Sequence, residues 1–216
     1  MEFTKLSNRL DLVASFVPEG ARLLDVGSDH AYLPIALLQE GKIEAAIAGE
    51  VVEGPYQSAV QNVADNGLDD KIEVRLANGL AAFEPTDSIS CITIAGMGGR
   101  LIADILAAGF SKLANVSRLV LQTNNREDEL RAWLVDHDFR LVDEASLEEN
   151  EKFYEILVVE QGSQELSAKE LRFGPYLMRE QAPAFVQKWS KEVEKLAFAL
   201  EQVPVENQSA RASLEE

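Results

Sequence analysis

Short apolar runs alternate with helically spaced apolar positions over most of the chain. The runs at residues 23–26, 45–52, 72–76, 90–95 and 119–123 are bounded by turn residues, which predicts buried strands. Helical spacing at residues 3–17, 32–38, 56–66, 101–109 and 127–138 predicts helices before and between these strands. Strands that alternate with helices favour an α/β fold in which helices cover a parallel sheet.

The pattern changes after residue 138. Residues 139–147 and 152–159 alternate or run apolar on either side of an acidic loop at residues 148–151, which predicts a final β-hairpin. The expected sheet then has seven strands, unlike the six-stranded sheet of NAD-binding domains. Gly162 and Ser163 mark a boundary, so we expect one domain over residues 1–161 and a smaller helical domain over residues 162–216.

The C-terminal part has its own helical pattern. It begins at Ser167 and is interrupted at Gly174-Pro175, because a helix seldom continues through this pair. A longer helix is expected from near Pro183, with an apolar stripe spaced by three and four residues: Val186, Trp189, Val193, Leu196 and Leu200. We expect this stripe to be buried against residues 167–181 or against a second copy of the chain. The polar tail after Pro204 is expected to be disordered.

The composition restricts the class of protein. The 216 residues carry a net charge of −17, which argues against a general nucleic-acid binder but allows one local basic face. Residues 1–161 hold 13 basic and 28 acidic side chains, a net −15, whereas residues 162–216 hold 7 and 9, a net −2. No apolar stretch is long enough to span a membrane and no signal peptide is evident, so we expect a cytoplasmic protein. The single cysteine, Cys91, is expected in the core.

The turn after the first predicted strand is the strongest candidate for a ligand site. Gly27 ends the strand, and a glycine can adopt positive φ and let a ligand approach the backbone. The glycine-rich G-x-G-x-x-G pattern of dinucleotide sites is absent, so an NAD enzyme ranks last. Asp29 and His30 follow instead, and a carboxylate suits a cationic ligand such as the amino acid and sulfonium parts of S-adenosylmethionine. An ordinary strand–helix turn is the alternative.

Two further turns point to the same edge of the sheet. Glu50 lies 23 residues after Gly27, near the end of the second strand, where an acid can accept hydrogen bonds from a ribose diol or simply face water. The fourth strand runs into G-M-G-G at residues 96–99, and glycines so dense indicate close backbone approach. We expect this turn to lie beside the first, facing the methyl group of such a cofactor and the base that would accept it. Met97 would then contact a base or the cofactor, or it merely fills space. Gln122, Asn124 and Asn125 either line the acceptor pocket or form a turn.

Several motifs together identify a family. D-V-G-S-D-H-A-Y-L-P, G-E-V-V-E-G-P, N-G-L, I-A-G-M-G-G, L-Q-T-N and F-G-P-Y-L resemble the bacterial tRNA (adenine-N1)-methyltransferases that modify adenosine 22, over residues 3–200. The resemblance implies a Rossmann-like, seven-stranded class I methyltransferase domain and a C-terminal coiled-coil-like helical domain. The tail here is short for a second coiled-coil strand. The N/D-P-P-Y/F tetrad of many amino-methylating enzymes is absent, which argues against methylation of an exocyclic amine and favours a ring nitrogen or another acceptor.

The resemblance also implies roles for individual residues. Asn78 is expected to accept from the exocyclic amine of adenine, although Asn-Gly is also a common turn pair. Asp29 is the candidate catalytic residue, as a carboxylate near the cationic product, or it only orients the methionine amine. No metal site is expected. The implied S-adenosylmethionine-binding residues are Gly27, Asp29, His30, Glu50, Val51, Asn78, Gly79, Ala95, Gly96 and Met97, and the candidate tRNA contacts are Arg9, Arg100, Arg126, Lys188, Lys191 and Lys195.

Two other functions stay open at this level. The acidic composition would suit a methyltransferase that acts on a small molecule or a protein. A non-enzymatic module could retain the fold and use the C-terminal stripe as an interaction surface. The oligomeric state is left open by the sequence.

Overall fold

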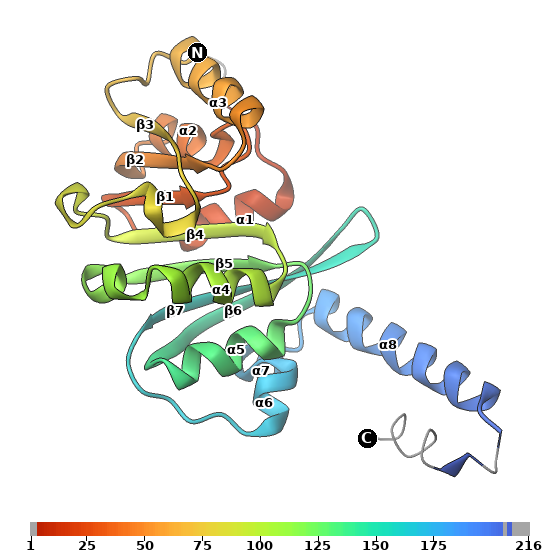
Figure 1. Cartoon of the computed structure of the whole chain (residues 1–216). Coiled ribbons are helices and arrows are strands. Elements are labelled where there is room, and N and C mark those ends of the chain that lie inside the picture. Colours follow the sequence, from red (N-terminus) through yellow and green to blue (C-terminus); the bar gives the residue numbers. More distant parts are fainter. Residues whose placement is uncertain (1–3, 205–206, 209–216) are drawn as a thin grey trace.

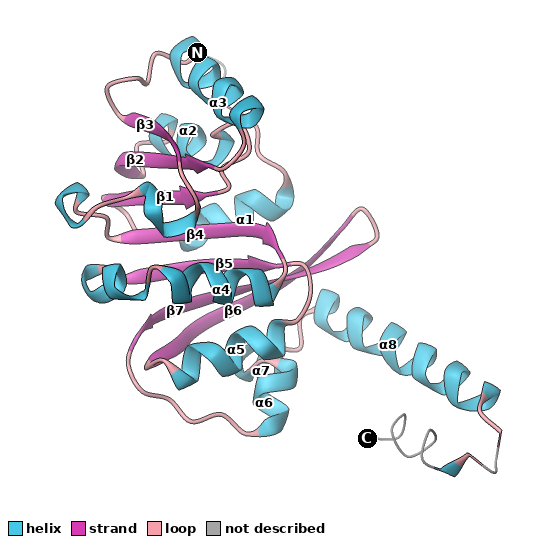
Figure 2. Ribbon diagram, viewed as in Figure 1, coloured by secondary structure: helices cyan, strands magenta, loops and turns pink. Residues whose placement is uncertain are grey.

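The core of the molecule is one seven-stranded sheet, shown in Figures 1 and 2. The structure is a computed structural model that describes residues 4–204 and 207–208. The strand order is β3-β2-β1-β4-β5-β7-β6. The strands are β1 (Ala21–Val26), β2 (Ile43–Glu50), β3 (Ile72–Leu76), β4 (Cys91–Met97), β5 (Arg118–Thr123), β6 (Phe139–Glu149) and β7 (Lys152–Gln161). The predicted seven-stranded α/β fold and its terminal hairpin are confirmed.

The sheet topology places the predicted turns at one edge. Strands β1 to β5 are parallel, whereas β7 is antiparallel to both β5 and β6. Because β4 lies directly beside β1, the G-M-G-G turn adjoins the first turn, as expected. The strand bounds differ from the prediction mainly at β2, which ends at Glu50 because Val51 and Val52 are exposed and lead into the next helix.

Helices cover both faces of the sheet. One apolar cluster packs α1 (Asn8–Phe16), α2 (Tyr32–Gln39) and α3 (Glu53–Asp65) on one face, and a second cluster packs α4 (Gly99–Ala108) and α5 (Glu127–Asp136) on the other. Short 3-10 turns lie at Gly79–Ala82, Pro85–Asp87 and Phe110–Asn115. Helix α1 is shorter than predicted because Ser7 caps it, accepting a hydrogen bond from the Leu10 backbone at 3.3 Å. Phe3, the first residue of that prediction, lies outside the described residues.

Three helices follow the sheet: α6 (Ala168–Phe173), α7 (Pro175–Glu180) and α8 (Pro183–Gln202). A buried ionic cluster ties them to the sheet. The fully buried Arg131 guanidinium donates to Glu144 at 2.8 Å, to Glu155 at 2.6 Å and to the Leu171 carbonyl at 3.1 Å. Lys188 of α8 donates to the second oxygen of Glu155 at 2.7 Å. The first turns of α8 are therefore fixed to β7 and α5 by charged hydrogen bonds.

Within the single chain, the apolar stripe of α8 is packed against residues 167–181 only at one end, and its burial against a second copy stays a prediction. Trp189 packs on Phe173 of α6, with ring centroids 4.5 Å apart. Farther along, Val193 is 64% exposed and Leu196 is 43% exposed, because α8 extends away from the sheet and no other described helix lies along it (Figure 1). The prediction of burial against residues 167–181 is therefore right only near Trp189. The polar tail after Pro204 lies almost entirely outside the described residues.

Candidate cofactor and acceptor site

The turn after β1 holds an uncommon backbone conformation. Gly27 has φ +69°, as the sequence predicts, and a Cβ there would lie 2.6 Å from Cε of Met97. Asp29, His30 and Ala31 also have positive φ, of 43°, 67° and 59°, which the sequence does not reveal. Each such non-glycine residue is strained by about 1–3 kcal/mol and persists only where surrounding contacts impose the conformation. The lack of a side chain at Gly27 therefore leaves room for the end of the Met97 side chain against the turn.

Two side chains from other elements hold this strained turn. The Asp29 backbone N–H donates to Oε1 of Glu50 at 2.6 Å, and Nδ2 of Asn62 donates to the His30 carbonyl at 2.8 Å. The Asp29 carboxylate itself is 85% exposed and lies 3.5 Å from Nε2 of His30. Asp29 thus presents an exposed carboxylate at the rim of the turn, where the resemblance implies a role in binding or catalysis.

Glu50, the predicted ribose ligand, is a buried acid beside the first turn. It lies at the end of β2, is 5% exposed, and uses only Oε1 toward another described residue. Burial raises the pKa of Glu50, and the hydrogen bond from Asp29 opposes that shift. Oε2 remains able to accept from a hydroxyl group. Val51, the next residue, is 61% exposed and lies outside the strand.

Asp25 is a feature that the sequence reasoning missed. Its buried carboxylate lies under the turn and accepts hydrogen bonds from Ser28 and Thr93, each at 2.6 Å. Burial raises the pKa of Asp25 to about 6 because it outweighs both hydrogen bonds, and the nearby Glu50 and Asp29 charges add to the shift. The available signal was an acid inside an otherwise apolar strand, two residues before Gly27.

The turns after β4 and β5 interlock. Oε1 of the fully buried Gln122 accepts from the Gly96 backbone at 2.8 Å and from the Arg9 guanidinium, while Asn124 donates to the Gly96 carbonyl at 2.7 Å. A Cβ on Gly99 would lie 2.2 Å from the Arg126 carbonyl oxygen. The dense glycines therefore serve close backbone packing. Gln122 holds the turn, whereas Asn124 and Asn125 are exposed on its surface.

The remaining predicted cofactor residues lie at the same edge. Ala95 lies in β4 directly before Gly96. Asn78 is exposed after β3, and Gly79, with φ +54°, packs against Ile105 of α4. The β3 turn is joined to β2 because the Ala77 N–H donates to the Glu50 carbonyl at 2.7 Å. The carboxyl ends of β1 to β4 thus bring all the predicted cofactor residues to one edge of the sheet.

The predicted basic residues have different surroundings. The Arg9 guanidinium lies 5.5 Å from the centre of the Tyr154 ring and reaches the acceptor side through Gln122. Arg100 and Arg126 are exposed and both pair with Glu129. Lys188 is not a free surface cation, because it is mostly buried between Glu127 and Glu155. Lys191 and Lys195 are exposed on α8.

The residues around the first turn fit a cationic cofactor. Asp25, Asp29 and Glu50 surround it, and no lysine or arginine among the described residues forms a hydrogen bond within it. A phosphate group would meet carboxylates there, whereas a sulfonium and an ammonium group would be stabilised. Among residues 4–204 and 207–208, no group of histidine, cysteine, aspartate and glutamate could hold a metal ion. None of the described helices is long and apolar enough to cross a bilayer.

Comparison with known proteins agrees with this geometry. The family model described as tRNA (adenine(22)-N(1))-methyltransferase matches residues 23–216. A Bacillus subtilis protein of that name is 43% identical over 210 residues, which cover 94% of this chain and 87% of the relative. The match extends over both the sheet and the C-terminal helices.

Solved structures agree in fold over nearly the whole chain. A Streptococcus pneumoniae protein described as a candidate tRNA (m1A22) methyltransferase has a TM-score of 0.96 at 67% identity, covering 97% of this chain and 95% of that one. The structure of that protein in complex with S-adenosyl-L-methionine has a TM-score of 0.91 at 66% identity, covering 97% and 94%. The chain belongs to the tRNA (adenine(22)-N(1))-methyltransferase family.

Proposed function

We propose that this protein transfers the methyl group of S-adenosylmethionine to N1 of adenosine 22 in tRNA, giving 1-methyladenosine. The single observation that supports it best is the pair of adjoining turns after β1 and β4. One carries a cradle lined by carboxylates, and the other carries the interlocked glycines where an acceptor base would lie. The family match supplies the acceptor atom and its position in the tRNA.

The residues that would bind the cofactor have distinct roles in this proposal. Glu50 would accept from the ribose hydroxyls through Oε2, while Oε1 keeps the Asp29 backbone in place. Gly27 and Met97 would bound the cradle, and Asn78 would accept from the adenine amine. His30, Val51, Gly79, Ala95 and Gly96 would complete the site. S-adenosylmethionine, when bound, supplies a methyl group on a cationic sulfur.

Methyl transfer to N1 requires mainly that the adenine and the methyl group are held in line. N1 of adenine has a free lone pair, so no base is needed before attack, and holding two reactants in line is a large part of catalysis. The product is cationic, and the exposed Asp29 carboxylate is the candidate that would stabilise the developing charge. Arg9, Arg100 and Arg126 lie near the acceptor side and would meet tRNA phosphates. Such a reaction would take place in the cytoplasm.

The test uses labelled S-adenosylmethionine with unmodified tRNA, alongside calorimetry of cofactor binding. We expect 1-methyladenosine in the wild-type reaction. In Glu50→Gln, cofactor affinity should fall by about tenfold or more, since a charge-assisted bond to the ribose is weakened. The matched control is Glu53→Gln, whose exposed side chain accepts a hydrogen bond from Gln57 at 2.7 Å on the surface of α3. Cofactor binding without any labelled tRNA would refute the RNA substrate and favour a small molecule or protein.

A further inference from the structure

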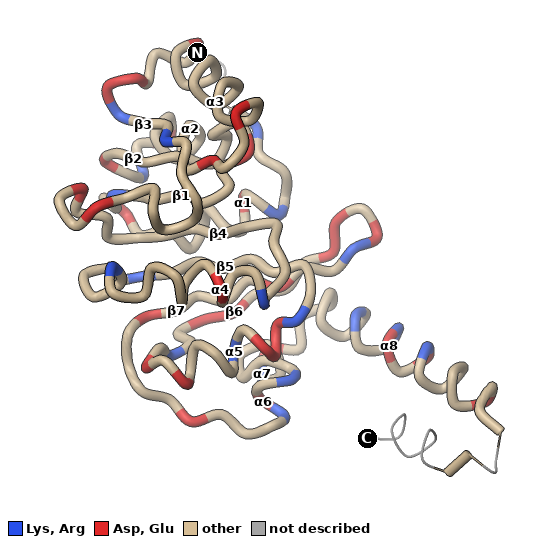
Figure 3. Tube along the Cα trace, in the orientation of Figure 1, with Lys and Arg blue, Asp and Glu red and all other residues tan. Residues whose placement is uncertain are grey.

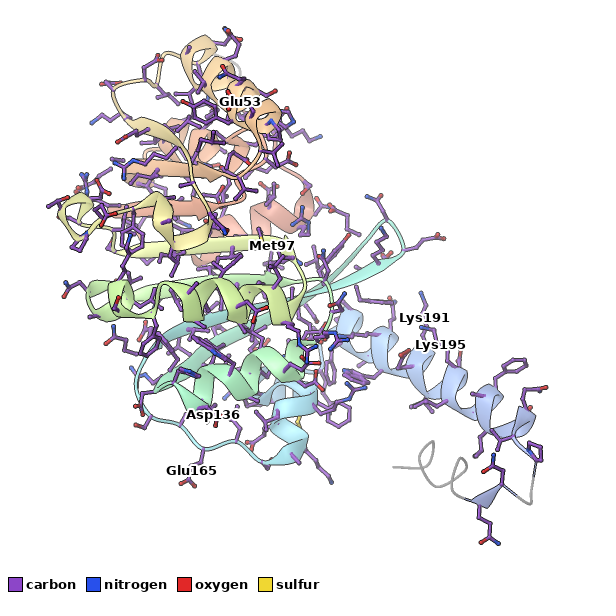
Figure 4. All side chains as sticks on the ribbon, viewed as in Figure 1. Glu53, Met97, Asp136, Glu165, Lys191 and Lys195 are labelled. Atoms are coloured by element: carbon purple, nitrogen blue, oxygen red, sulfur yellow. The ribbon has the colours of Figure 1, made fainter. Side chains whose placement is uncertain are left out.

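Asn124, which directly follows β5, has an exposed side chain that is bonded to the acceptor turn. Its Nδ2 donates to the Gly96 carbonyl at 2.7 Å, and its backbone N–H donates to the Met97 carbonyl at 2.9 Å. Figure 4 shows Met97 at the end of β4, and the end of its side chain lies against the turn at Gly27. Asn124 is therefore attached to the turn that adjoins the predicted cofactor site.

A chain of hydrogen bonds sets the orientation of the Asn124 amide. Oε1 of the buried Gln122 accepts from the Gly96 N–H at 2.8 Å and from the Arg9 guanidinium, so this oxygen faces both donors. Nε2 of Gln122 then donates to Oδ1 of Asn124 at 3.1 Å. If the Asn124 amide were turned over, two donors would meet at Gln122 and two acceptors would meet at the Gly96 carbonyl. Asn124 consequently presents its oxygen and its nitrogen at fixed places.

The fixed amide keeps an unused acceptor position. Oδ1 can accept two hydrogen bonds, and among the described residues it accepts one, from Gln122. The side chain also lines a cavity of about 710 Å³ between the end of β5, the β6–β7 hairpin and α8, a volume in the usual range of ligand pockets. Oδ1 of Asn124 is therefore able to accept one further hydrogen bond from a group that enters this cavity.

The strand ends around Asn124 carry no charge. Residues 91–99 and 119–125 contain no aspartate, glutamate, lysine or arginine, and the ends of β4 and β5 are accordingly tan in Figure 3. A base at this turn would be recognised by neutral amides, through the donors and acceptors on its edge. A neutral acceptor matches the exocyclic amine of adenine, which donates, and opposes O6 of guanine, which accepts.

We propose that Oδ1 of Asn124 accepts a hydrogen bond from the exocyclic amine of the target adenine and so selects adenine as the base to be methylated. This inference rests on the proposed function, because it takes adenosine in tRNA as the acceptor. The amine and N1 are neighbours on one edge of adenine, so a contact with the amine also fixes the place of N1 and leaves its lone pair free. Guanine would bring O6 against Oδ1, and its N1 carries a hydrogen.

Asn125 provides a matched control in the same turn. It is an exposed asparagine like Asn124, but no described residue forms a hydrogen bond with its side-chain amide. An amide that is free to turn over offers a donor and an acceptor equally. We therefore expect Asn125 to contribute no discrimination at the amine.

The test compares two tRNAs that differ in one group. One carries adenosine at position 22, and the other carries purine riboside there, which retains N1 and lacks only the exocyclic amine. The rate of methylation of each is measured at low tRNA concentration and saturating cofactor for wild type, Asn124→Ala, Asn124→Asp and Asn125→Ala. The readout is the ratio of the two rates in each protein, because a displaced turn slows both tRNAs and cancels in the ratio.

The ratio of adenosine to purine riboside should be about two- to tenfold lower in Asn124→Ala than in wild type, which corresponds to the loss of one neutral hydrogen bond. Asn124→Asp should keep the wild-type ratio or raise it, since both carboxylate oxygens are acceptors, even if both rates fall. Asn125→Ala should keep the wild-type ratio. A wild-type ratio in Asn124→Ala, or an equal decrease in Asn125→Ala, would overturn the proposal.

A second variant covers the case in which Asn124→Ala does not fold. Asn124→Leu removes the acceptor at nearly constant volume, and it should show the same decrease in the ratio; a wild-type ratio there would overturn the proposal. Failure of the proposed function is distinguishable, because wild-type protein would then label neither tRNA. Failure of this inference alone would leave methylation of adenosine 22 intact, with a ratio that does not depend on Asn124.

Discussion

Gly99→Ala tests whether the turns after β4 and β5 have to interlock for the site to form. The added Cβ would lie 2.2 Å from the Arg126 carbonyl oxygen and 2.9 Å from its carbonyl carbon. Ordinary contact begins at 3.4 Å, so the two backbones must move apart by 3.4 minus 2.2, or 1.2 Å. Neither neighbour is the end of a flexible side chain, so the strain cannot be relieved locally.

The size of the effect follows from this geometry. Overpacking of this kind typically destabilises a protein by about 1–3 kcal/mol, and two opposed backbones place Gly99→Ala at about the upper value. Separation also stretches the hydrogen bond from the Gly99 N–H to the Asn125 carbonyl, now 2.9 Å. For a domain of this size, each 1 kcal/mol lowers Tm by about 2–4 °C, so a decrease of about 6–12 °C is expected.

The assay is thermal unfolding combined with cofactor titration. Gly54→Ala is the control, because it lies in the first turn of α3 with open space around its Cβ position. Its Tm should be unchanged or slightly higher, since alanine favours a helix over glycine. Gly99→Ala should also lose methylation rate, because the acceptor turn moves. Equal Tm, cofactor affinity and rate in the two variants would refute the reasoning.

Three other predictions concern buried polar groups. Arg131→Met leaves the buried Glu144 without a cationic partner and leaves Glu155 with Lys188 alone, so it should lower the free energy of unfolding by about 3–5 kcal/mol in urea titrations; an unchanged value would contradict it. Burial raises the pKa of Asp25 to about 6 from 3.8, so the folded state holds a proton between these values that the unfolded state has lost. The contribution of Asp25 to stability therefore falls by up to about 3 kcal/mol as pH rises from 4 to 6, and Asp25→Asn should remove this slope in urea titrations at several pH values. Gln122→Leu leaves the Gly96 N–H and a guanidinium without their acceptor, so methylation should slow while the far-ultraviolet circular dichroism spectrum is retained; an unchanged rate would show that Gln122 does not position the turn.

The parts of the fold that depend on local pattern could be predicted from the sequence. The apolar runs and the glycines between them identify the strands, the hairpin and the positive φ of Gly27. Glu50 could be placed at the same edge as Gly27 because the carboxyl ends of parallel strands share one edge of a sheet. These features follow from spacing within a few residues or from the rules of sheet topology.

The missed features depend on contacts between distant parts of the chain. Asp29 has positive φ, and its N–H donates to Glu50, 21 residues away in the sequence, a contact that no local pattern indicates. Gln122 holds Gly96 across two strands, which no local pattern indicates. Lys188 resembles a surface cation in its helix, yet its position opposite Glu155 makes it a structural residue. The apolar stripe of α8 has the spacing of a packed helix, but this spacing does not reveal which element, if any, packs against it.

The measurement that tests the central claim most directly is nucleoside analysis of tRNA methylated by the wild-type protein with labelled S-adenosylmethionine. Two unmodified substrates are compared, one with adenosine at position 22 and one with guanosine there. The account predicts labelled 1-methyladenosine in the first tRNA and none in the second. Equal labelling of both tRNAs, or label in any other nucleoside, would contradict it.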